Sequence, residues 1–371
     1  MGAFDAATDQ MALNLRVGAL NLLSNCAEAQ VGERLLIAYE PEDHGYFDKN
    51  LRSDIGQAAR ELGLHVSAFN VGFEPMAECL GETLLSSMQH ADIVLFLARL
   101  GDQFRFSTLP DGPRILVCFA QSSEMLASSF GTAHYNAFCE AKRAVDLRMM
   151  QAREITITCP AGTEVKGHVP DDIAKATDTS LIRFPMSVFS PVLAREFSGR
   201  VALGDFLTGT GVHYYESYTV EFCEPVFAYL ERGRIAGFEG SARDVAKANA
   251  HYDRVSKTFG LDRNAVHSWH AGIHPGCGFH LDIRGAYEKW GGAAFGNPRV
   301  LHFHTCGAEP PGEISWNLFD PTIMVDGMAL WENGTFCLDR LDEGPGILAQ
   351  YPCAAAAFAQ PDREVGFQDV N

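Results

Sequence analysis

The chain has 371 residues, 47% of them hydrophobic and 20% charged, which is more material than one hydrophobic core usually organises. A formal net charge of −18 disfavours phosphate backbones and anionic lipids as partners. No apolar run reaches the roughly 18 residues of a membrane span, and the first residues lack the regions of a signal peptide. Ten scattered cysteines without a CxxC pair are typical of reduced thiols. We therefore predict a cytoplasmic protein that binds neither nucleic acid nor membrane.

Residues 1–152 alternate between strand-like and helix-like segments, which predicts an N-terminal α/β domain. Short apolar runs indicate buried strands at residues 34–39, 65–69, 92–97 and 114–119, because strands covered on both faces lose the alternation of polar and apolar residues. Helical spacing predicts helices at residues 54–62, 81–90 and 135–151. Repeated β-α units of this kind imply a Rossmann-like parallel sheet with helices on both faces.

Residues 153–371 change to short alternating segments separated by glycine. Strands are expected at residues 155–158, 164–169, 200–203, 234–238, 299–304 and 322–325, and one long helix at 241–260. Alternation is typical of sheets with one exposed face. We therefore predict a mixed, mainly antiparallel α+β domain at the C-terminal end of the chain, and we expect this domain to carry the functional site.

Six histidines gather within about forty residues of the second domain. They are His267, His270, His274, His280, His302 and His304. Because residues two apart on a strand face the same side, His302 and His304 can point at one site. Imidazole is the commonest ligand for zinc, iron and nickel, and Glu309, Glu313 or Asp320 could add a carboxylate. The alternative is a set of hydrogen-bonded core or surface histidines, since the spacing matches neither a zinc finger nor an HExxH helix.

Other chemistry has weaker support. Tyr215 and Glu216 lie in the polar segment VHYYESYTVEFCEP, which could be a pocket wall or an exposed strand face. No GxGxxG follows the first strand, so a nicotinamide cofactor is disfavoured. The absence of a GxSxG elbow argues against an α/β-type serine hydrolase.

The order of seven further segments resembles a known superfamily. They are VGERLLIAYEP, ADIVLFL, GPRILVCF, ITITCPAGTEVKGHV, GRVALGDFL, CEPVFAYLERGRIAGFEG and PTIMVDGMALWENG, and a Glu-Pro element at Glu74 lies between the first two. Together they resemble the aminopeptidase T-like metallopeptidases and the 2,5-dihydroxypyridine 5,6-dioxygenases over residues 10–335. The resemblance implies that superfamily's two-part fold and a homo-oligomer.

The metal ligands depart from that pattern. His270 stands where the peptidases have a first glutamate and the ring-cleaving dioxygenases a histidine. The expected His-x-Asp pair before residue 321 is replaced by Ser315–Asn317 or Leu318–Asp320. The acid-base histidines that the dioxygenases have near residues 100–107 and 184–191 are also absent. Loss of carboxylates argues against a two-metal peptidase, which needs them to bridge its ions.

The resemblance and the histidines together favour a mononuclear non-haem iron(II) oxygenase acting on a small aromatic or heterocyclic acid. We predict His270 and His304 as ligands, Asp320 as the third, and His302 as a further ligand or a nearby base. His274, Glu216 or Tyr215 would move protons, and a cation such as Arg105 would bind an anionic substrate. The alternatives are a zinc- or manganese-dependent amide or peptide hydrolase and a metal-free binding protein of the same fold.

Overall fold

The computed structural model describes residues 2–170, 179–209 and 214–367. A five-stranded parallel sheet forms its first layer, in the order β2-β1-β3-β4-β7. Its strands are β1 (Arg34–Tyr39), β2 (His65–Asn70), β3 (Ile93–Leu97), β4 (Arg114–Cys118) and β7 (Ile182–Phe184). Helices cover both faces, as alternate residues of β1 show. Leu35 and Ile37 share a core with Ile55 of α2 (Leu51–Glu61), whereas Leu36 packs in a second core with Met88 of α3 (Glu82–Gln89). The predicted α/β layer is therefore confirmed.

Two antiparallel sheets form the remainder, which confirms the predicted α+β part. The six-stranded sheet has the order β11-β10-β16-β15-β14-β8, with β8 (Val192–Leu193), β10 (Phe206–Thr208), β11 (Val220–Glu221), β14 (Val266–Ala271), β15 (Val300–Cys306) and β16 (Glu313–Phe319). The eight-stranded sheet has the order β13-β12-β9-β6-β5-β17-β18-β19. Its strands are β5 (Ile155–Thr158), β6 (Glu164–Gly167), β9 (Ser198–Ala202), β12 (Phe227–Glu231), β13 (Arg234–Glu239), β17 (Thr322–Val325), β18 (Met328–Glu332) and β19 (Thr335–Phe336).

The largest core includes residues of both antiparallel sheets. Trp269, Phe303 and Trp316 come from the six-stranded sheet, and Ile157 and Ile323 from the eight-stranded one. Each of these side chains is fully buried, and a buried aromatic side chain removes about 150–250 Å² from water. One face of the six-stranded sheet therefore packs into this core, and the residues that alternate with these point to the opposite face.

Two elements cross the predicted division after residue 152. Helix α7 (Tyr135–Met150) contributes Phe138 and Val145 to the core of the antiparallel part, and β7 completes the parallel sheet from beyond that point. The remaining helices are α1 (Gly2–Leu20), η1 (Asn21–Cys26), η2 (Glu42–His44), α4 (Arg99–Gln103), α5 (Ser123–Ala127), α6 (Ser129–Thr132), α8 (Ala242–Phe259), α9 (Tyr287–Ala293), η3 (Ala294–Gly296), η4 (Leu338–Arg340), α10 (Gly344–Gln350) and α11 (Pro352–Ala359).

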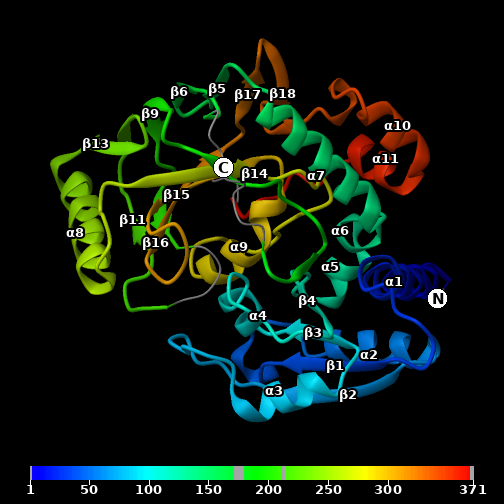
Figure 1. The fold of residues 1–371 in the computed structure, drawn as a ribbon. Coiled ribbons are helices and arrows are strands. Elements are labelled where there is room, and N and C mark those ends of the chain that lie inside the picture. The colour runs from blue at the N-terminus through cyan, green and yellow to red at the C-terminus, as the bar shows by residue number, and fades with distance from the viewer. Residues whose placement is uncertain (1, 171–178, 210–213, 368–371) are drawn as a thin grey trace.

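Helix α9 lies between the parallel sheet and the antiparallel sheets, as Figure 1 shows. The carboxyl ends of β3, β4 and β7 lie near it, since residues just after each of these strands line one cavity together with α9. This edge is where open parallel sheets usually bind ligands. None of the helices in the described part of the chain is both long and apolar enough to cross a membrane.

Candidate metal centre

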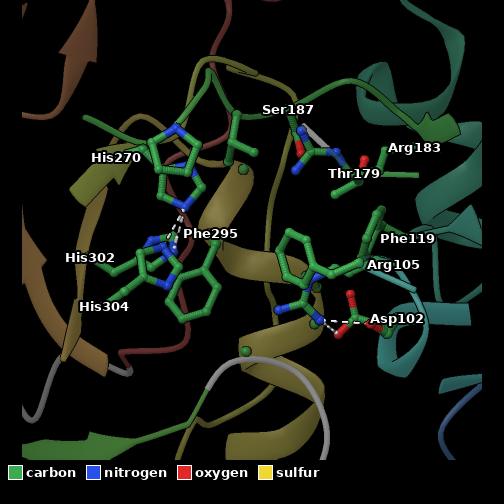
Figure 2. Close-up of a pocket in the computed structure, with 17 residues that line it drawn as sticks. Asp102, Arg105, Phe119, Thr179, Arg183, Ser187, His270, Phe295, His302 and His304 are labelled. Atoms are coloured by element: carbon green, nitrogen blue, oxygen red, sulfur yellow. Dashed lines mark hydrogen bonds and ion pairs between the residues drawn. The ribbon is translucent and has the colours of Figure 1, made fainter. Parts of the chain in front are cut away.

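Three histidines meet on two neighbouring strands. His270 of β14 lies directly opposite His302 of β15, and His304 follows two residues later. Their neighbours Trp269 and Phe303 point into the core, so the period of two places all three imidazoles on the other face. Nε2 of His270 lies 2.8 Å from Nε2 of His302 and 3.2 Å from Nε2 of His304. Figure 2 shows the three rings turned toward one another.

Two of the rings are oriented by oxygen atoms that contact Nδ1, on the side of the ring away from the cluster. Nδ1 of His270 lies 3.0 Å from the backbone carbonyl oxygen of Phe189. Nδ1 of His304 lies 2.8 Å from Oε1 of Glu313, in an ion-pair contact rather than an aligned hydrogen bond. Both partners attract a proton to Nδ1, which leaves the lone pair on Nε2, the atom turned toward the cluster. Carboxylates and carbonyls behind metal-binding histidines act in this way.

The third ring is held by stacking. His302 lies against the ring of Phe295 with centroids 3.9 Å apart and an interplanar angle of 22°. Its Nδ1 is buried and has no hydrogen-bond partner among the described residues. The stack fixes the ring plane, so Nε2 of His302 is aimed at the other two imidazoles without a hydrogen bond.

Burial keeps the imidazoles of His270 and His302 neutral. Desolvation, helped by the neighbouring histidine, lowers the pKa of His270 well below its usual value, and Arg183 and Arg105 add to the effect. Burial and the adjacent imidazoles likewise lower the pKa of His302. Neutral imidazole is the form that binds a metal, so the site is ready for an ion at neutral pH.

The donor set fits a single transition-metal ion. Nitrogen lone pairs held this close repel one another unless a proton or a cation lies between them. Two nitrogens about 2.0–2.1 Å from one ion stand about 2.8–3.2 Å apart when they subtend angles of about 85–105°. Three imidazoles suit zinc or iron rather than magnesium or calcium, which prefer oxygen. Among the described residues, these three form the one cluster with metal-ligand spacing.

A cavity of about 110 Å³ opens beside the histidines. One water needs about 10–15 Å³ of such space, so the cavity can hold a small molecule. Its far wall carries Arg105, whose Nη1 lies 2.8 Å from Oδ2 of Asp102. Arg183 and the rings of Phe119 and Phe295 are also part of the lining, as Figure 2 shows.

Asp320 does not join the histidines, which corrects the prediction that it is the third ligand. Its carboxylate binds Arg299 at 2.6 and 2.7 Å and Arg363 at 3.3 Å. Asp320 follows the end of β16, where Phe319 pairs with Val300, so it lies beyond the edge of the site. Two arginines satisfy this carboxylate, and it serves as a structural ion pair.

His274 belongs to the core rather than to the cavity. Its ring stacks on Phe138 with centroids 3.7 Å apart, and Phe130 meets it edge-on. Nδ1 accepts a hydrogen bond from the backbone N–H of Gly276. Burial lowers the pKa of His274 to about 3. The structure therefore does not support the predicted proton-transfer role.

The other two predicted proton carriers also lie away from the cavity lining. Tyr215 is half-buried, with its ring against Tyr218 and Phe259. Glu216 is exposed. Residues 210–213, at the start of the same segment, lie outside the described part of the chain. Tyr215 and Glu216 precede the short strand β11 (Val220–Glu221), so neither the pocket wall nor the exposed strand face that the sequence suggested forms at these two residues.

Glu313, one of the three carboxylates considered from the sequence, lies at the start of β16 beside Nδ1 of His304. On the same strand, Ser315 pairs with His304 and Asn317 with His302. Both are fully buried, and Oγ of Ser315 donates to Oδ1 of Asn317 at 3.0 Å. The segment in which a His-x-Asp pair was expected thus borders the site, but it presents a hydroxyl and an amide. Alternation over residues 313–319 was the available signal.

Comparison with known structures matches this architecture to two proteins. The 2,5-dihydroxypyridine dioxygenase from Pseudomonas putida KT2440 matches with a TM-score of 0.56 at 15% identity, over 86% of this chain and 96% of that one. AmpT from Thermus thermophilus matches with a TM-score of 0.51 at 12% identity, over 88% and 99%. The chain has their fold. The resemblance drawn from the ordered sequence segments is thereby confirmed at the level of the fold, although no family model and no curated protein sequence matches.

Proposed function

We propose that this chain is an enzyme that uses one metal ion held by His270, His302 and His304. The observation that carries the proposal is the convergence of three buried Nε2 atoms beside a cavity. A structural zinc site is usually closed by four protein ligands, whereas catalytic sites keep a position open for water or substrate. Three ligands next to a cavity of this size fit the second kind.

Within that class, we favour a mononuclear iron(II) oxygenase acting on a small aromatic or heterocyclic acid. The described ligand cluster contains no carboxylate to bridge two ions, which disfavours a two-metal hydrolase. Iron(II) in such a site would supply the electrons that activate dioxygen. The chain's own part is to orient the imidazoles through Phe189 and Glu313 and to exclude water with the rings of Phe119 and Phe295.

Proton transfer at this site would fall to Asp102. It is the carboxylate that lines the described cavity, and burial raises its pKa despite the charge of Arg105. A raised pKa brings a carboxyl group nearer to the working range of a general base. Arg105 would hold the carboxylate in place and so fix the direction of transfer.

A single-metal hydrolase is the second candidate, because three histidines with an open position also suit a zinc-bound water. To separate the two, metal-free protein would be loaded without oxygen with iron(II), zinc or manganese. Oxygen uptake would be followed with a panel of hydroxylated benzoates and pyridinecarboxylates, and hydrolysis with amino-acid anilides. We expect oxygen uptake with iron(II) alone, lost in His302→Ala and kept in His280→Ala, whose histidine is outside the cluster. Anilide hydrolysis with zinc and no oxygen uptake would favour the hydrolase.

A further inference from the structure

Helix α9 and the short helix η3 that follows it form one wall of the histidine site. Gly291 and Gly292 of α9 and Phe295 of η3 line the cavity, and the ring of Phe295 stacks on His302 with centroids 3.9 Å apart. Figure 2 shows these two rings against each other. Because Nδ1 of His302 has no hydrogen-bond partner among the described residues, the place of Phe295, and hence of α9 and η3, decides how this imidazole is oriented.

Arg99, which follows β3 of the parallel sheet, holds this wall through an ion pair. Its Nη1 lies 2.9 Å from Oε1 of Glu288 in the first turn of α9, and its Nε lies 3.0 Å from Oε2 of Glu40, just after β1. The guanidinium carbon is 3.5 Å from the centroid of the Phe73 ring and 4.7 Å from that of Tyr46. Two carboxylates and two rings leave the planar guanidinium little freedom, so it gives Glu288 a fixed point of attachment.

Two contacts from neighbouring strands hold α9 against the same edge of the sheet. Nε2 of Gln121, which follows β4, donates a hydrogen bond to the backbone oxygen of Lys289 at 2.8 Å. The hydroxyl group of Tyr46, in the connection after β1, occupies the space that a Cβ atom at Gly292 would need. Segments that follow β1, β3 and β4 therefore all contact α9, and the Arg99–Glu288 pair adds a charge-assisted contact, which is the stronger kind.

We propose that the Arg99–Glu288 ion pair positions α9 and η3 so that Phe295 aligns the ring of His302 with the other two imidazoles. Arg99 is outside the lining of the histidine cavity, so it is a positioning residue that acts through Glu288 and Phe295. The parallel sheet would in this way set the geometry of a site whose ligands all come from an antiparallel sheet. The inference rests on the proposed function for the use of the ion, whereas the alignment of the ring can be measured without one.

The first test is NMR spectroscopy of the metal-free chain labelled at histidine, with the His302 signals assigned by their absence in His302→Ala. Protons of a ring stacked on an aromatic face are shielded, so these signals should lie upfield of their usual range and lose that shielding in Phe295→Leu. Glu288→Gln removes the charge on α9 and keeps the Arg99–Glu40 pair, and it should move the same signals toward their usual range. His302 signals that stay in place in Glu288→Gln would overturn the inference.

The second test is a double-mutant cycle on zinc affinity, measured by calorimetry. Glu288→Gln and Phe295→Leu should each weaken zinc binding about tenfold, since groups that orient metal ligands commonly contribute about 10- to 100-fold. If the ion pair acts through Phe295, the double variant should bind zinc no more weakly than Phe295→Leu alone, whereas independent effects would multiply. A multiplied loss, or an unchanged affinity in Glu288→Gln, would contradict the positioning role.

Glu332→Gln is the matched control for both tests, because it breaks an exposed ion pair with Arg340 and should change neither the His302 signals nor the zinc affinity. Circular dichroism checks the fold. If Glu288→Gln does not fold, Glu288→Asp replaces it with the same expected results, because it keeps the charge and shortens its reach. A wild-type chain that binds no zinc, but whose His302 signals still move in the Glu288 variant, would remove the metal enzyme and leave the positioning role standing.

Discussion

Replacing His274 by Phe should flatten the acid dependence of stability. His274 is fully buried against Phe138, and its pKa in the folded chain is about 3, against a usual value of 6.5. Below pH 6.5 the unfolded chain takes up a proton at this residue that the folded chain cannot accept. The folded state therefore loses stability as the pH falls from 6.5 toward 3.

The magnitude follows from the two pKa values. Each pH unit between them costs about 1.4 kcal/mol, so His274 alone should remove about 2 kcal/mol between pH 8 and pH 5. The same arithmetic applies to His251, whose pKa burial also lowers to about 3. Two such residues remove a large share of the roughly 5–15 kcal/mol that stabilises a typical domain.

Urea unfolding of the wild-type chain and His274→Phe at pH 8 and pH 5, with a chelator present, measures the effect. The variant loses the hydrogen bond from Gly276 at both pH values, so comparison at pH 8 isolates that cost. We expect the variant to lose about 2 kcal/mol less than the wild type on going to pH 5. An equal loss in both proteins would refute the assignment of His274 as a neutral core residue.

Three further changes test the site and its support. Glu313→Gln removes the negative charge behind His304 and should weaken zinc binding about 10- to 100-fold by calorimetry; unchanged affinity would mean that Glu313 does not orient the ring. Arg99→Met leaves the buried Glu40 carboxylate without its partner at 3.0 Å and should lower the free energy of unfolding in urea by about 3–5 kcal/mol. Arg340→Met breaks an exposed ion pair with Glu332 and should lower it by under about 1 kcal/mol. Similar losses of stability in the two variants would contradict the claim that burial makes the Arg99–Glu40 pair the more important one. Zinc at about 100 times its Kd should stabilise the chain by about 2.7 kcal/mol, and a stabilisation that persists in His302→Ala would place the ion elsewhere.

Much of the fold could be predicted because its signals are local. The apolar run at residues 34–39 became β1 with the same bounds, and the helix expected at 135–151 is α7. Glycine and serine mark the ends of α8, where Ser241 caps the first turn and Gly260 takes a left-handed φ of 67°. The position of β7 could not be predicted, because joining a strand to a distant sheet depends on packing that no local pattern records.

The site could be predicted only in part, because its assembly also depends on packing between segments that are distant in the sequence. A period of two was enough to put His302 and His304 on one face. Pairing His270 with His302 depends on a strand register set across an insertion that contains α9. Asp320 follows the end of β16, three residues beyond Asn317 and seven beyond Glu313, and no local pattern in the sequence distinguishes the positions that border the histidines from the one that does not. The cytoplasmic location, the self-association and the identity of the metal stay predictions.

The central claim is that three imidazoles from β14 and β15 hold one ion. Metal-free chain would be titrated with zinc by calorimetry, and the loaded protein examined by X-ray absorption to count imidazole ligands. We predict one ion per chain with three imidazoles, and loss of that binding in His270→Ala, with the fold kept as judged by circular dichroism. No binding to the wild-type chain, or undiminished binding to His270→Ala, would contradict the account.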